Sequence, residues 1–191
     1  SIVVPPVSNA TDFSTPPSLA ACQNTAFTFV RKNTPTAPTS FQWDVDGSPA
    51  PNFDNKNLVY SFTSAGPHTI KMTAIYSTGC KSTKTNTITV NRAPLANFDV
   101  ALADRSSCKT PFTVNFTDLS RGNTQRKFDY GDGTPSVLEP SSNSATHTYT
   151  KAGNHTVSLI AINQFGCSDT TDNLTYKDYI KIQVPTLLVP P

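Results

Sequence analysis

The stretch Phe128-Asp-Tyr-Gly-Asp-Gly133 decides the fold, because an aromatic-led strand there runs directly into a tight turn. Glycine supplies the positive φ angles that such turns need, and aspartate bonds the backbone of its own turn. A second strand ends at Tyr149, Gly153 turns the chain, and residues 155–162 alternate apolar with polar side chains. Alternating runs between tight turns are typical of antiparallel strands with one buried face.

The same layout occurs earlier in the chain and indicates an internal repeat. Trp43-Asp-Val-Asp-Gly47 corresponds to the aromatic-led turn. Three residues recur 87 positions later: Gly66 as Gly153, His68 as His155 and Cys80 as Cys167. The 191 residues therefore divide into two modules of about 90 residues each. No apolar spacing of 3.6 residues is sustained over three turns, so the sequence predicts almost no helix.

The repeat predicts the division of the chain into segments. They are a Pro-rich linker at 1–8, β-sandwiches at 9–91 and 96–184, a short linker at 92–95 and a Pro-rich linker at 185–191. Strands are expected at residues 26–31, 40–45, 112–116, 125–130 and 154–163. The two Pro-rich ends are similar in sequence, which leads to the hypothesis that the pair of modules is one unit of a longer array.

Four cysteines are divided evenly between the copies. They are Cys22 and Cys80 in the first, and Cys108 and Cys167 in the second. Four cysteines allow three connectivities, and their matching positions favour one disulfide within each copy. Modules of this size often need such a covalent staple. An oxidising compartment is therefore expected, and zinc is not, because the sequence has no C-x-x-C pair.

The charge balance excludes some classes of function. The net charge is only +2, and the doublets Arg31-Lys32 and Arg126-Lys127 are interpreted as solvated strand ends. Nucleic-acid binding, which usually shows clustered Lys and Arg, is not expected. Membrane insertion is not expected either, because no apolar run approaches about 20 residues. The chain starts at Ser1 without a signal peptide, so it is expected to be mature or part of something longer.

At these residues the chain resembles the PKD (polycystic kidney disease) domain, an immunoglobulin-like β-sandwich. The family pattern has a W-x-F-G-D-G turn, then H-x-Y, a Gly and an alternating strand. The matching residues are Trp43, Asp46, Gly47 and Gly66 in the first copy, and Phe128, Gly131, Asp132, Gly133, His147, Tyr149 and Gly153 in the second. The first copy has Val45-Asp46 where the family has Phe-Gly-Asp. The resemblance implies an all-β chain of two tandem antiparallel β-sandwiches, which the cysteine positions would supply with one disulfide each.

The resemblance also implies a function. With its added cysteines the chain looks like PKD modules of large secreted or cell-surface bacterial proteins. The expected role is a non-catalytic structural or adhesive module, a spacer or stalk segment that mediates protein or surface interaction. Its partners would be other domains of the same polypeptide, with cell-surface proteins or polysaccharide as further candidates. The alternative is an accessory module of a secreted hydrolase that binds polysaccharide or protein fibre.

An enzyme is not expected, because the sequence has no constellation of nucleophile, base and orienting group. Asp129 and Asp132 lie within one turn, where aspartate commonly caps backbone N–H groups. Some PKD-like modules of secreted proteases bind calcium, so these two residues are also calcium candidates, and no other cofactor is expected. Tyr76, Tyr130 and Phe165 lie at strand ends or in loops and could stack on a sugar ring, with incidental exposure as the other interpretation.

Overall fold

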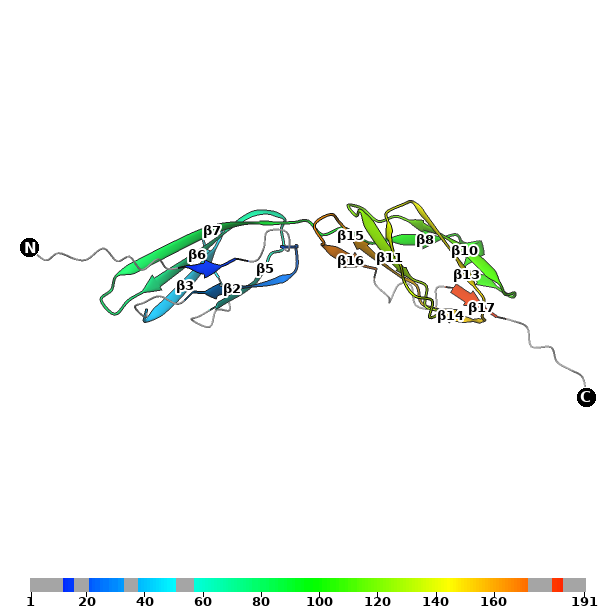
Figure 1. Ribbon diagram of the computed structural model, residues 1–191, viewed down its shortest axis with the longest axis horizontal. Helices are drawn as coiled ribbons and strands as arrows, with labels where there is room; N and C mark the ends of the chain where they lie inside the picture. The colour runs from blue at the N-terminus through cyan, green and yellow to red at the C-terminus, as the bar shows by residue number, and fades with distance from the viewer. Residues whose placement is uncertain (1–11, 16–20, 33–37, 51–56, 172–179, 184–191) are drawn as a thin grey trace, which may run out of the picture. The chain divides into compact units, whose positions relative to one another are not determined.

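The computed structural model describes residues 12–15, 21–32, 38–50, 57–171 and 180–183. Both Pro-rich linkers of the sequence, residues 1–8 and 185–191, lie outside these described residues. The chain divides into two compact units, Ser1–Arg92 and Ala93–Pro191. Apart from one 3-10 turn, η2 (Leu102–Asp104), the described elements are all β-strands (Figure 1), which confirms the all-β prediction.

The first unit is a sandwich of two antiparallel sheets. One sheet has the strand order β1-β2-β5, and the other has the order β4-β3-β6-β7. The strands are Phe13–Ser14 (β1), Ala26–Arg31 (β2), Ser40–Val45 (β3), Ser48–Pro49 (β4), Asn57–Ser61 (β5), Gly66–Ile75 (β6) and Lys81–Val90 (β7). Side chains alternate between the two faces of a strand, and this brings one row from each sheet into a common core.

Trp43 on β3 is the centre of the first core and is only 1% exposed. The ring of Phe13 meets Trp43 edge-on, with the two ring centroids 5.1 Å apart. On β2, Phe27 and Phe29 are buried while Thr28 between them is exposed, as the period of two predicts. The aromatic residue that leads the turn is therefore a core residue.

The second unit has a similar pair of sheets and one small additional sheet. The strand orders are β13-β10-β8, β12-β11-β15-β16 and β14-β17-β9, and among the described strand pairs of this unit only β17 and β9 are parallel. The strands are Phe98–Val100 (β8), Ser106–Ser107 (β9), Phe112–Asp118 (β10), Gln125–Asp129 (β11), Leu138–Pro140 (β12), Ser144–Tyr149 (β13), Gly153–His155 (β14), Ser158–Ile162 (β15), Ser168–Thr170 (β16) and Ile180–Ile182 (β17). Phe98, Phe116 and Phe128 lie at the centre of its core.

The long strand of the first unit, β6, corresponds to two strands in the second, β14 and β15. The reason lies in the neighbouring turn, where the second copy has one residue more, Gly131. Gly131 has a φ of 72° and packs so closely on Thr156 that an added Cβ would overlap the Thr156 backbone. The extra residue therefore contacts the backbone at the point where β14 and β15 separate.

The prediction of one disulfide within each copy is wrong. Cys22 and Cys167 are disulfide-bonded, whereas Cys80 and Cys108 are exposed free thiols. In the first unit the backbone of Cys22 forms an isolated β-bridge with Asn91, just after β7 ends. Cys80 lies in the turn at the opposite end of β7. β6 and β7 are each ten residues long, so the two ends lie about 30 Å apart.

The second unit has the same arrangement. Cys108 follows β9, which pairs with β17 beside Gly153, and Cys167 lies in the turn between β15 and β16. The cysteines therefore lie at opposite ends of the sandwich, whereas a disulfide requires Cα atoms about 4.4–6.8 Å apart. Matching positions in a repeat indicated a shared role for the cysteines, but the sequence alone did not reveal that each pair is divided between two ends.

Candidate functional site

The turn after β11 is held together by the carboxylates of Asp129 and Asp132. Asp129 Oδ1 accepts a hydrogen bond from the backbone N–H of Gly131 at 2.9 Å. Asp132 Oδ1 accepts one from the backbone N–H of Thr134 at 3.0 Å, and its Oδ2 lies 2.8 Å from His147 Nε2. Both carboxylates of the calcium hypothesis are therefore bonded to the turn that contains them.

Behind this turn the rings of Tyr130, His147, Tyr149 and His155 form a continuous stack. His147 lies parallel to Tyr130 at 4.0 Å, Tyr149 meets His147 edge-on at 4.7 Å, and His155 stacks on Tyr149 at 4.5 Å, all between ring centroids. Tyr149 Oη donates a hydrogen bond to the carbonyl of Tyr130 at 3.0 Å. Burial raises the pKa of Tyr149, and the nearby charge of Asp132 raises it further, so the phenol remains a donor.

His155 closes the inner end of this stack and is only 7% exposed. Its Nδ1 lies 3.3 Å from the carbonyl oxygen of Gly131, and its Nε2 is a buried nitrogen without a hydrogen-bond partner among the described residues. An open depression of about 500 Å³ lies between residues 131–135 and 150–155 and includes His155 in its lining. The other titratable groups that line it are Asp132, already bonded to His147, and Lys151.

The first unit has a simpler turn at the same place. Asp46 and Gly47 join β3 to β4 with φ angles of 52° and 80°, which is the signature of a two-residue type I′ hairpin turn. Asp46 Oδ1 accepts a hydrogen bond from the backbone N–H of Thr69 at 2.8 Å, and its Oδ2 lies 2.7 Å from His68 Nδ1. The departure from the Phe-Gly-Asp pattern therefore produces a regular hairpin.

An aspartate–histidine pair thus occurs in both units, but the histidines come from different strands. Asp46 meets His68 on β6, and Asp132 meets His147 on β13. The sequence aligned His68 with His155, which instead reaches the Gly131 carbonyl oxygen. The H-x-Y spacing of the second copy was the signal for His147, because it places the histidine two residues before the buried Tyr149.

The Asp132–His147 pair should make the stability of the second sandwich depend on acidic pH. Burial alone would raise the pKa of Asp132, but hydrogen bonds from His147 and Thr134 outweigh it and lower the pKa to about 2. A carboxyl with a depressed pKa in the folded state stabilises the protein above its unfolded pKa, near 4. We therefore expect about 2 kcal/mol of unfolding free energy to be lost as the pH falls from about 4 to about 2.

Asp132→Asn should lack this contribution and show a flatter profile over the same range. Hydrogen exchange of amides in β11 and β15, followed against pH, reports the second sandwich, while Trp43 fluorescence reports the first. Asp129→Asn is the matched control, because it leaves the Asp132–His147 contact in place. A profile for Asp132→Asn as steep as that of the unchanged chain would contradict the prediction.

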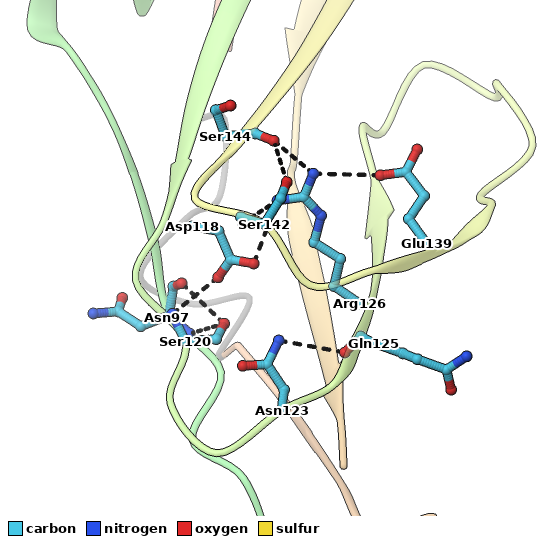
Figure 2. Close-up of polar contacts among 9 residues, drawn as sticks. All are labelled: Asn97, Asp118, Ser120, Asn123, Gln125, Arg126, Glu139, Ser142 and Ser144. Atoms are coloured by element: carbon cyan, nitrogen blue, oxygen red, sulfur yellow. Dashed lines mark hydrogen bonds and ion pairs between the residues drawn. The ribbon is translucent and has the colours of Figure 1, made fainter. Parts of the chain in front are cut away.

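A second polar cluster surrounds Arg126 on β11 (Figure 2). Arg126 donates hydrogen bonds of 2.6 Å to the backbone carbonyls of Ser142 and Ser144. Its guanidinium also lies 3.4 Å from Asp118 Oδ2 and 3.4 Å from Glu139 Oε2. The side chains of Arg126 and Asp118 are each 4% exposed, so this is a buried ion pair.

The interpretation of Arg126 as a solvated strand end is therefore wrong. The alternation of β11 was the missed signal, because Arg126 stands two residues before the buried Phe128 and so faces inward. Backbone carbonyls and two carboxylates surround the two terminal nitrogens of the guanidinium and give its buried charge structural partners, whereas its Nε is buried without a hydrogen-bond partner among the described residues. The arrangement stabilises this end of the sandwich.

The three aromatic residues proposed as ligand contacts occupy different environments. Tyr76 is 8% exposed and belongs to the core of the first unit. Tyr130 packs against the second core within the ring stack, whereas Phe165 is 40% exposed in the turn between β15 and β16. Tyr130 and Phe165 lie at opposite ends of their sandwich, so the structure does not bring them together.

In the described part of the chain, no group of three or more His, Cys, Asp or Glu side chains is placed to bind a metal ion. Within the same residues, no helix has the length and apolarity needed to cross a bilayer.

Several solved structures are similar in fold. Fibronectin(III)-like modules of Clostridium thermocellum CbhA share 12% identity and a TM-score of 0.46, over 95% of this chain and 97% of that chain. SGBP-B of the Bacteroides ovatus mixed-linkage glucan utilization locus, in complex with a mixed-linkage heptasaccharide, shares 17% identity and a TM-score of 0.34, over 85% of this chain and 42% of that chain. The amphioxus IgVJ-C2 molecule shares 12% identity and a TM-score of 0.30, over 78% and 95%.

No curated protein matches the chain in sequence. The PKD domain, in contrast, matches twice in tandem, at residues 4–90 and 91–177. These two segments cover most of the 191 residues and include both aromatic-led turns. The chain belongs to the PKD domain family.

Proposed function

We propose that this chain is a non-catalytic extracellular spacer, a stalk segment of a larger secreted or cell-surface protein that holds other domains apart. The observation that carries the proposal is the path of the chain through each sandwich. In both units the first and the last described strands lead to opposite ends of the sandwich. A module with its ends at opposite poles adds its own length to an array.

In the first unit the chain enters beside the Cys80 turn and leaves beside Cys22. Phe13 on β1 pairs with the last residue of β2, near the start of β3, and that end also holds the β6–β7 turn. At the opposite end Asn91, directly after β7, forms the bridge with Cys22. The distance between the two ends is about 30 Å, the length of β6.

The second unit follows the same path. The backbone N–H of Ala96 donates a hydrogen bond to Asp169 Oδ2 at 2.8 Å, two residues after Cys167. At the other end the backbone N–H of Gln183 donates to the carbonyl of Ser107 at 2.9 Å, beside Cys108. The chain therefore enters at the Cys167 end and leaves at the Cys108 end.

The acid–base residues of the turns support a structural role. The Asp46 and Asp132 carboxylates each accept a backbone hydrogen bond within the sandwich and pair with a histidine, and Asp129 caps its own turn. Groups bonded in this way stabilise turns. In the first unit His68 Nε2 also lies 3.0 Å from the backbone carbonyl oxygen of Ser64 and 3.5 Å from Ser64 Oγ, so both of its ring nitrogens are engaged by the turn residues.

The spacer proposal predicts the dimensions of an array. Chains of one, two and three copies, fused end to end, should increase in maximum dimension in proportion to copy number, by roughly 30 Å or more per sandwich. Small-angle X-ray scattering measures this dimension directly. A maximum dimension that grows only as the cube root of mass would mean that the copies collapse on one another, and would overturn the proposal.

Binding to an insoluble polymer is the alternative, and retention experiments distinguish it. A spacer should pass unretained over chitin, cellulose and collagen, with calcium or with chelator. Retention that Phe165→Ala abolishes would support an accessory binding module, since Phe165 is exposed and an aromatic ring can stack on a sugar. Retention that requires calcium and is lost in Asp129→Asn would support the metal hypothesis instead.

A further inference from the structure

Cys80 and Cys108 carry free thiols, although the corresponding cysteine of the other repeat is disulfide-bonded in each case. Cys80 corresponds to Cys167, 87 residues later. Cys22 corresponds to Cys108, because Cys22 precedes β2 and Cys108, directly after β9, precedes β10, the strand that corresponds to β2. Cys22 and Cys167 are both disulfide-bonded, whereas Cys80 and Cys108 are exposed. The repeat therefore contains two disulfide-forming positions, and each is bonded in one copy and free in the other.

The two positions differ in their place along the chain path. We name Cys80 and Cys167 the entrance cysteines, because the chain enters each sandwich at their end. Cys22 and Cys108 are the exit cysteines, because the chain leaves at theirs. About 30 Å separates the entrance from the exit cysteine of one sandwich, so neither can pair with the other.

The surroundings of the free thiols suit a partner from another repeat. Cys108 lines an open depression of about 300 Å³, together with Ser106, Lys181 and Gln183. Cys80 lies at the end of the exposed β6–β7 turn. The backbone N–H of Tyr76 donates a hydrogen bond to the carbonyl of Cys80 at 3.0 Å, which closes this turn. Cys80 is thus exposed on an ordered turn, and the open depression beside Cys108 can receive such a turn.

We propose that Cys80 and Cys108 form disulfides with cysteines of neighbouring repeats, each exit cysteine bonding the entrance cysteine of the repeat that follows. Cys22, the exit cysteine of the first repeat, and Cys167, the entrance cysteine of the second, are each disulfide-bonded. Cys108 would then bond the entrance cysteine of a following PKD repeat, and Cys80 the exit cysteine of a preceding one. This inference rests on the proposed role as a spacer in an array.

The bond requires a two-electron oxidant, and oxidised glutathione or a disulfide oxidoreductase is the class that supplies it. The Cys108 thiolate attacks the oxidant disulfide, which gives a mixed disulfide and releases one glutathione thiolate. The thiolate of the entrance cysteine then attacks Cys108 Sγ and releases the second glutathione. The protons lost by the two protein thiols are taken up by the two glutathione thiolates, so two thiols and one oxidised glutathione give one protein disulfide and two reduced glutathiones.

The test uses two copies of the full chain fused end to end, each copy retaining one of the two free cysteines. In the forward arrangement the first copy carries Cys80→Ser and keeps Cys108, and the second copy carries Cys108→Ser and keeps Cys80. With oxidised glutathione, both remaining free thiols should disappear while the molecule stays monomeric. A peptide map without reduction should join the Cys108 peptide of the first copy to the Cys80 peptide of the second.

The reversed arrangement is the matched control, because it has the same composition and the same number of thiols. Its first copy keeps Cys80 and its second keeps Cys108, so the thiols lie at the outer ends of the fusion. Closure within one molecule should be on the order of 100-fold faster in the forward arrangement, through the higher effective concentration of its facing thiols. A third variant has the forward arrangement, with Ser77→Cys and Cys80→Ser in the second copy. It moves the thiol within the same exposed turn, and its disulfide should also form slowly.

Equal closure rates in the forward and reversed arrangements would overturn the inference, because they would show only the reactivity of exposed thiols. Free thiols that persist in the forward arrangement would overturn it as well. The maximum dimension of the reduced fusion, measured by X-ray scattering, is independent of the disulfide. The spacer proposal can therefore fail or hold separately from the disulfide.

Discussion

Gly131→Ala is expected to destabilise the second sandwich by roughly 2–5 kcal/mol. The positive φ of 72° at this residue costs a side-chain-bearing residue about 1–2 kcal/mol. The new Cβ would also overlap the backbone of Thr156, and overpacking of this kind typically costs about 1–3 kcal/mol. The neighbour is backbone and cannot rotate away, so β11 or the β14–β15 junction must move. Urea denaturation with hydrogen exchange of β15 amides measures the loss.

Gly133→Ala is the matched control for this prediction. Gly133 lies in the same turn with a φ of 86°, but nothing lies within 4 Å of the Cβ that alanine would add. Only the backbone strain remains, about 1–2 kcal/mol. Equal losses for the two substitutions would show that the contact with Thr156 relaxes without cost.

The sequence predicted the strands best where alternation and turn residues agreed. The predicted strands 26–31 and 40–45 coincide with β2 and β3, because large apolar residues there alternate with polar ones between clear turns. The predicted strand 154–163 is interrupted between β14 and β15. The interruption depends on the close approach of Gly131 to Thr156, a contact between distant segments that no local pattern contains.

The candidate site was predictable in its residue types and not in its pairings. The Asp and Gly residues of the two turns were identified from turn chemistry, and both aspartates do bond turn or neighbouring backbone. Which histidine meets which aspartate depends on the residue types of two strands as well as on the turn, because the first copy has Tyr60 at the position that His147 occupies 87 residues later. In the second copy, whose turn is one residue longer, Asp132 meets His147 on β13, and His155 on β14 lies beside the carbonyl oxygen of Gly131.

The two sandwiches stabilise the same end in different ways. By strand register, Arg31 on β2 occupies the position that Asp118 occupies on β10, and Phe41 on β3 the position of Arg126 on β11. In the first sandwich the Arg31 guanidinium lies 4.5 Å from the centroid of the Phe41 ring. A cation–π contact in one copy thus stands where the other copy has a buried ion pair, so this end of the sandwich accepts two different ways of holding an arginine.

Asp118→Ala is expected to destabilise the second sandwich by roughly 3–5 kcal/mol, because it leaves the buried charge of Arg126 without its buried carboxylate partner. Glu139→Ala is the matched control. Its carboxylate lies at the same 3.4 Å from the same guanidinium, but the Glu139 side chain is 49% exposed, against 4% for Asp118. Exposed ion pairs contribute about 0–1 kcal/mol, so the two losses should differ severalfold. Urea denaturation of each variant measures both.

The double variant Asp118→Ala, Arg126→Phe separates the cost of an unpaired charge from the loss of a contact. Phenylalanine is the residue that the first sandwich has at this position, and it removes the charge that Asp118→Ala leaves uncompensated. The double variant should therefore be more stable than Asp118→Ala alone, by about 1–3 kcal/mol. If it is less stable, the guanidinium matters chiefly through its 2.6 Å hydrogen bonds to the carbonyls of Ser142 and Ser144, which phenylalanine cannot replace.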